Sequence, residues 1–128
     1  AHIGIYKAFG EHGHTFDALG GSSGGAAMAA AFTEGLPPED IDERVDAMFV
    51  RGRAMARYTL PRYGLLDHTH FDRHLREQYG ETRIEYYWKP YFAVALDLTD
   101  VALRVIRSGP AWTAIRASSA IPGLLPPY

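Results

Sequence analysis

The sequence contains no cysteine among its 128 residues, which excludes a disulfide framework and any metal site built on thiolates. It also has no long hydrophobic run, because its longest uncharged stretch, residues 18–33, holds 16 residues that are mostly Gly, Ala and Ser. Such a stretch is too short and too weakly apolar to span a bilayer. Charge of one sign does not dominate either, since 13 Lys and Arg balance 15 Asp and Glu. The net charge of −2 therefore argues against a nucleic-acid partner.

The remaining composition is that of a folded domain. Hydrophobic residues make up 47% and charged residues 22%, and the length suits one domain. The first residues, 1–4, show neither a starting Met nor a signal-peptide pattern, so we expect the chain to be the interior of a longer domain.

Periodicity and capping residues predict alternating helices and strands. Helices are expected over residues 1–13, 26–35 and 111–119. Another should begin at Pro38 and carry an apolar stripe that ends at Phe49. A fifth should begin at a cap, either Asp67 or Thr69, and end at Gly80. Strands are expected over residues 15–19, 91–96 and 101–106, the last two forming a hairpin. This order predicts an α/β fold. The strand over residues 15–19 has no partner before it, which again suggests an interior fragment.

The stretch Gly21-Ser22-Ser23-Gly24-Gly25 matches G-x-S-x-G, the nucleophile elbow. The glycines let a strand and a helix pass closely, and the helix directs backbone N–H groups at a developing oxyanion. A glycine-rich turn with a serine cap, or a phosphate-binding loop, would have a similar composition. Two frames overlap, so spacing alone leaves both Ser22 and Ser23 as candidate nucleophiles.

No histidine base follows the elbow in the order that α/β-hydrolases use, Ser then acid then His. The last histidine is His74, and none follows Asp97, which ends a predicted strand. The sequence therefore argues against a Ser-His-acid triad and leaves room for a dyad.

Two further clusters of side chains are candidate sites. His70 and His74 are four residues apart near His68, a spacing that suits metal ligands, but no H-E-x-x-H pattern is present and a solvated helix face explains the segment. Aromatic and basic side chains could form a membrane-facing or ligand-facing rim, with ordinary packing and surface charge as the simpler explanation. These side chains are Tyr58, Tyr63, Tyr86, Tyr87, Trp88, Arg51, Arg53, Arg57 and Arg62.

Four stretches of the chain resemble the patatin-like phospholipases, most closely the branch of neuropathy target esterase and its bacterial relatives. Residues 1–8 are similar to the helix after that family's Gly-rich oxyanion loop, and residues 20–26 to its G-G-T-S-x-G elbow. Residues 84–97 are similar to its central strand, and residues 116–127 to its R-A-S-x-x-I-P-x-x-x-P-P block. The resemblance implies a three-layer fold with a central sheet flanked by helices, incomplete at both ends, so that residues 1–128 form a partial domain.

The resemblance also implies roles for the elbow residues. Ser23 takes the position of the nucleophile, Gly24 that of an oxyanion donor, and Gly21 and Gly25 those of the elbow glycines. The family uses a Ser-Asp dyad without metal or other cofactor. The oxyanion loop is expected before Ala1, and the catalytic Asp, in a D-G-G or D-G-A motif, beyond residue 128. We do not assign that role to Asp97, and we expect residues 1–128 alone to be catalytically silent.

The function so implied is a serine esterase, a phospholipase or lysophospholipase acting on lipid acyl esters. The apolar segment from Leu124 to Pro127 is expected to form a wall near Ser23. A non-catalytic patatin-like module that binds lipid or a partner is the alternative, and a histidine-rich metal binder is a third. The expected partner is a phospholipid or lysophospholipid, with peripheral membrane contact, and the expected location is the cytoplasm.

Overall fold

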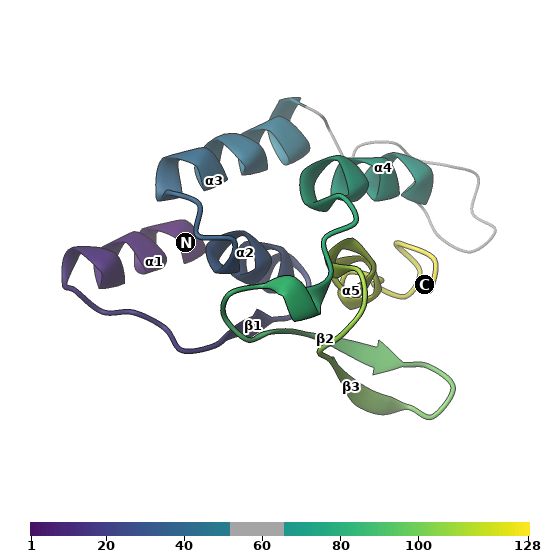
Figure 1. Ribbon diagram of the computed structural model, residues 1–128. Helices are drawn as coiled ribbons and strands as arrows, with labels where there is room; N and C mark the ends of the chain where they lie inside the picture. Colours follow the sequence, from purple (N-terminus) through teal and green to yellow (C-terminus); the bar gives the residue numbers. More distant parts are fainter. Residues whose placement is uncertain (52–65) are drawn as a thin grey trace.

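A three-stranded sheet and five α-helices make up the part of the chain that the computed structural model describes, residues 1–51 and 66–128 (Figure 1). The α-helices are α1 (His2–Glu11), α2 (Gly24–Thr33), α3 (Pro38–Val45), α4 (His68–Tyr79) and α5 (Ala111–Ser118), and the strands are β1 (Leu19–Gly21), β2 (Tyr91–Asp97) and β3 (Ala102–Ile106). A π-helical turn, η1 (Asp46–Arg51), continues α3, and a 3-10 turn, η2 (Ile84–Tyr86), precedes β2. The predicted α/β class is confirmed.

The strand β2 lies at the centre of the sheet. β1 pairs with it in parallel, with Leu19 opposite Tyr91 and Gly21 opposite Ala93. β3 pairs with its other edge in antiparallel register, which confirms the predicted hairpin. The partner of β1 thus comes much later in the chain, so no earlier strand is needed for β1 to join a sheet.

The prediction of a strand over residues 15–19 is wrong in its bounds, because β1 covers only Leu19–Gly21. Phe16 contacts the aromatic side chains of α1 instead, with ring centroids 5.9 Å from Tyr6 and 5.2 Å from Phe9. Phe16 therefore packs on α1, and the sheet begins only at Leu19.

The Ala-rich helix α2 is the centre of the core. Its buried residues include Ala26, Ala27, Ala29, Ala30, Ala31 and Phe32, and their small side chains let neighbouring elements approach closely. Two buried tyrosines donate hydrogen bonds to its carbonyls, Tyr79 to Ala27 at 2.8 Å and Tyr91 to Ala26 at 3.1 Å. Burial raises the pKa of both hydroxyls well above the ordinary value of 10.0.

Local signals explain the ends of the other helices. Asp67 caps α4 by accepting a 3.0 Å hydrogen bond from the Thr69 N–H, and Gly80 ends it with φ 53°. The predicted stripe of α4, Phe71, Leu75 and Tyr79, is buried as expected. Likewise Pro38 occupies the first turn of α3, and Ile41 on that helix is fully buried.

Candidate active site

Ser23 lies at the tip of the turn between β1 and α2, with φ 53° and ψ −123°. Within the described ranges, Val101 is the only other non-glycine residue with a positive φ. A positive φ strains the backbone of a serine, so this conformation persists only where the surrounding structure enforces it. The predicted turn between a strand and a helix is present, and Ser23, not the exposed Ser22, has the strained backbone.

The two elbow glycines are not equivalent. A Cβ built on Gly21 would lie 2.6 Å from the carbonyl oxygen of Gly25 and 2.8 Å from the backbone nitrogen of Ala26. A Cβ on Gly25 would meet only Nε2 of His2, at 3.9 Å, which is ordinary contact. The close passage of strand and helix therefore depends on the missing side chain of Gly21.

The first turn of α2 secures the carbonyl side of the elbow. The N–H of Gly25 donates to the Ser22 carbonyl at 2.9 Å, and the N–H groups of Ala26 and Ala27 donate to the Ser23 carbonyl at 2.9 and 3.2 Å. Among residues 1–51 and 66–128, nothing accepts a hydrogen bond from the Gly24 N–H. This N–H, at the positive end of the helix dipole, can stabilise a developing negative charge.

A serine of α5 secures the other side of the elbow. The N–H of Ser23 donates to Oγ of Ser118 at 2.8 Å. The Ser118 hydroxyl in turn donates to the carbonyl of Val94 on β2 at 2.6 Å. Ser118 belongs to the R-A-S block, but the sequence pattern alone did not indicate this contact with the elbow.

Two cavities flank the elbow. One, of about 640 Å³, extends from Ser22 and Ser118 along an apolar wall that includes Val94, Leu96 and Ile121. The other, of about 520 Å³, is lined by His2, Gly24 and Met28 among others. Of the segment from Leu124 to Pro127 that was expected to form a wall near Ser23, only Pro127 lines the first cavity, because Leu125 is fully buried in the core. The neighbouring residues Ile121 and Pro122 line this cavity instead.

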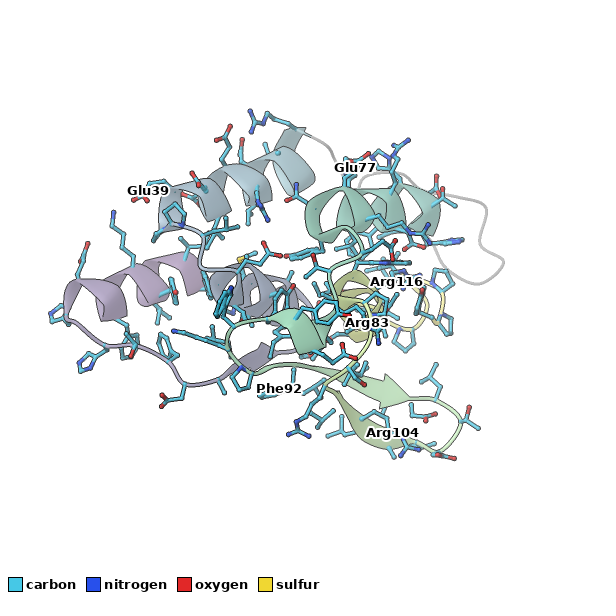
Figure 2. The ribbon with its side chains drawn as sticks, in the orientation of Figure 1. Glu39, Glu77, Arg83, Phe92, Arg104 and Arg116 are labelled. Carbon is cyan, nitrogen blue, oxygen red and sulfur yellow. The ribbon has the colours of Figure 1, made fainter. Side chains whose placement is uncertain are left out.

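Asp97 ends β2, and its carboxylate is used by the hairpin turn. Oδ1 accepts from the N–H groups of Thr99 at 2.9 Å and Asp100 at 3.3 Å. Oδ2 accepts from Nε of Arg104 at 3.2 Å, and Arg104 is labelled on the hairpin in Figure 2. The Thr99 N–H is the main cause that lowers the pKa of Asp97 below its ordinary 3.8. A carboxylate held in this way is a weak base, which argues against a catalytic role for Asp97.

The three candidate metal ligands His68, His70 and His74 lie on α4. The rings of His70 and His74 are 4.6 Å apart, edge to face. His70 Nδ1 lies 2.6 Å from Nη2 of Arg73, and His74 Nδ1 lies 3.2 Å from a carboxylate oxygen of Glu77. In the described part of the chain, no three His, Asp or Glu side chains are grouped so that they could hold a metal ion.

The predicted aromatic and basic rim is only partly visible. Tyr58, Tyr63, Arg53, Arg57 and Arg62 lie outside the described residues. Trp88 and Tyr86 are exposed, at 97% and 75%, whereas Tyr87 is half-buried beside Glu34. None of the helices in the described ranges has both the length and the apolar character needed to cross a membrane.

A buried ion pair is the second feature that the sequence reasoning missed. Arg116 of α5 is 1% exposed, and its Nε donates to Oδ1 of Asp72 on α4 at 2.5 Å, while Nη2 donates to the Pro126 carbonyl at 3.0 Å (Figure 2). Asp72 lies in the histidine-rich segment for which a solvated helix face was expected, and that expectation is wrong for Asp72, whose side chain is partly buried. The sequence did contain one indication of this contact, since Arg116 lies among the apolar residues of α5.

Comparison with known proteins gives one consistent family. The model of the patatin-like phospholipase family matches residues 1–128. An uncharacterised NTE family protein of Mycobacterium tuberculosis is 33% identical over 127 residues, which cover 99% of this chain and 22% of that protein. Patatin-like phospholipase domain-containing protein 7 of Rattus norvegicus is 33% identical over 131 residues, which cover 99% of this chain and 10% of that protein.

A third relative agrees with these two. Patatin-like phospholipase domain-containing protein 6 of Mus musculus is 31% identical over 131 residues, again 99% of this chain and 10% of that protein. The chain thus spans between 10% and 22% of the length of these relatives.

Proposed function

Because the chain belongs to the patatin-like phospholipase family, we propose that it carries the nucleophile of a lipid acyl ester hydrolase, and that this nucleophile is Ser23. The observation that carries the proposal is the positive φ of Ser23 between a glycine-ended strand and a helix. A serine strained in this way at a strand-to-helix turn presents its hydroxyl outward, as an elbow requires.

The proposed oxyanion hole uses the N–H of Gly24 as one donor. Two observations support it: this N–H has no acceptor within the described ranges, and it lies at the start of α2. The first residue of α1, His2, lines the same cavity as Gly24. A Gly-rich loop placed just ahead of α1, as the resemblance implies, would therefore arrive beside the elbow and add further donors.

The proposed reaction proceeds in two steps. Oγ of Ser23 attacks the acyl carbonyl carbon while a base takes its proton, and the alcohol leaves with a proton from that base. Water then attacks the acyl-enzyme, releases the fatty acid and regenerates Ser23. Among the residues described, none accepts a hydrogen bond from the Ser23 hydroxyl. The base is proposed to be the Asp of a D-G motif beyond residue 128.

The proposed substrates are phospholipids or lysophospholipids. The apolar cavity that begins at Ser22 and Ser118 supports this choice, because its wall of Val94, Leu96 and Ile121 suits an acyl chain. A protein that binds such substrates is also proposed to contact membrane surfaces peripherally.

A fluorophosphonate probe applied to the full-length protein tests the nucleophile. We expect labelling of wild type and of Ser22→Ala, and none of Ser23→Ala. Hydrolysis should fall by several orders of magnitude in Ser23→Ala, since loss of a serine nucleophile costs about 10⁶-fold in a well-studied protease. Labelling that survives in Ser23→Ala and disappears in Ser22→Ala would reverse the assignment.

Substrate and base are tested in the same assay. Lysophospholipid and medium-chain p-nitrophenyl esters should be hydrolysed faster than acetyl esters, and Asp97→Asn should keep its activity. Residues 1–128 alone should be silent, because loss of one oxyanion donor already costs about 10²–10³-fold. Lipid binding without turnover by the full-length protein would favour the alternative, a non-catalytic lipid-binding module.

A further inference from the structure

One hydroxyl joins three elements at the elbow. Oγ of Ser118, the last residue of α5, accepts from the Ser23 N–H at 2.8 Å and donates to the Val94 carbonyl at 2.6 Å. A serine hydroxyl has one proton and two lone pairs. Because its proton is directed at Val94 on the central strand, a lone pair remains for the N–H of Ser23.

The backbone at Ser23 needs restraint on both sides. Its conformation, φ 53° and ψ −123°, is of a kind that costs about 1–3 kcal/mol and that only its surroundings can maintain. The carbonyl of Ser23 is held by the N–H groups of Ala26 and Ala27. The N–H of Ser23 is held by Ser118, so the rotation about φ is restrained from α5.

The end of α5 is itself anchored. Arg116, two residues before Ser118, is 1% exposed and bonds Asp72 on α4 and the carbonyl of Pro126. Residues of α5 that precede Ser118, including Ala114 and Ile115, are buried in the main core. The acceptor that meets the Ser23 N–H therefore has a fixed position relative to the central strand.

We propose that Ser118 is a positioning residue, which holds the strained backbone of Ser23 and thereby aims the Ser23 hydroxyl. The inference rests on the proposed role of Ser23. Ser118 takes no part in bond making, since its proton is donated to the Val94 carbonyl and one of its two lone pairs accepts the Ser23 N–H. Without it the turn can relax, and a displacement of about 1 Å at a reacting group can cost about 10²-fold in rate.

The full-length protein provides a matched set of variants. Ser118→Ala removes the hydroxyl, Ser118→Thr keeps it, and Ser119→Ala removes the neighbouring hydroxyl, which forms no side-chain hydrogen bond within the described ranges. Ser118→Ala should lower kcat about 10–100-fold and change KM by less than about threefold. Ser118→Thr should recover most of kcat, and Ser119→Ala should match wild type.

Hydrogen exchange at the Ser23 amide, followed by NMR, gives a readout that does not depend on activity. The exchange should be slow in wild type and Ser119→Ala and fast in Ser118→Ala, because a donated N–H is protected. A merely structural hydroxyl would lower the melting temperature and leave kcat per folded molecule unchanged.

The outcomes separate the two proposals. An active wild type with unchanged kcat and unchanged Ser23 exchange in Ser118→Ala would overturn the positioning role, and so would an equal loss in Ser119→Ala. A wild type that neither hydrolyses esters nor labels at Ser23 would overturn the proposed function. In that case the exchange of the Ser23 amide still decides whether Ser118 holds the elbow.

Discussion

Replacing Gly21 with alanine tests the tightest backbone contact at the elbow. The new Cβ would lie 2.6 Å from the Gly25 carbonyl oxygen and 2.8 Å from the Ala26 nitrogen, and it would also meet the carbonyl carbon of Gly25. Comfortable contacts of this kind need about 3.5 Å, so β1 and α2 must separate by about 1 Å. Both groups are backbone, and neither can rotate away as a side chain could.

This separation sets the expected magnitude. Overpacking of a well-packed contact costs about 1–3 kcal/mol of stability. The effect on catalysis should be larger, because Ser23 lies between the two elements that move, and a 1 Å misplacement can cost about 10²-fold. Gly21→Ala should therefore fold with a melting temperature lower by several degrees and lose about 10²-fold in kcat/KM.

Gly25→Ala and Gly10→Ala are the comparisons. A Cβ on Gly25 meets only Nε2 of His2 at 3.9 Å, so its loss should be much smaller than that of Gly21→Ala. A Cβ on Gly10 of α1 would have no atom within 4 Å. Gly10→Ala therefore measures the effect of a Gly→Ala change in a helix without any new contact. The assays are ester hydrolysis, fluorophosphonate labelling rate and thermal unfolding. Equal losses in Gly21→Ala and Gly25→Ala, or a wild-type rate in Gly21→Ala, would show that the close contact at Gly21 does not position Ser23.

Two further predictions concern stability. Asp72→Ala should lower the free energy of unfolding by about 3 kcal/mol, because it leaves the buried guanidinium of Arg116 without its carboxylate. Asp100→Ala breaks an exposed pair with Arg104 and should lower it by less than about 1 kcal/mol. Urea unfolding measures both losses, and equal losses would contradict the stabilising role of the buried pair. Burial raises the pKa of Tyr79, so its stabilising contribution is complete below the ordinary 10.0 of the unfolded chain and declines as the pH rises above it. Tyr79→Phe should flatten this alkaline decline in stability, and an unchanged slope would count against the buried hydroxyl.

Local features of the structure were predictable because their causes are local. The cap at Asp67 and the stop at Gly80 act within one helical turn, and the hairpin of β2 and β3 joins neighbouring segments. The G-x-S-x-G pattern likewise placed a strand-to-helix turn at Ser23. The strand bounds were predicted less well, since Phe16 is held by the aromatic side chains of α1, a contact that β propensity does not reveal.

The family, the helices, the hairpin and the position of the elbow could be predicted from the sequence, because they follow from spacing, capping residues and motif composition. The residues that hold the elbow follow instead from the packing of distant segments. Ser118 reaches Ser23 across 95 positions of the chain, and Arg116 reaches Asp72 across 44. This packing also decided that Gly21 has no room for a side chain while Gly25 has. No periodicity encodes such contacts, since each depends on how closely two distant backbones pack once the core has formed.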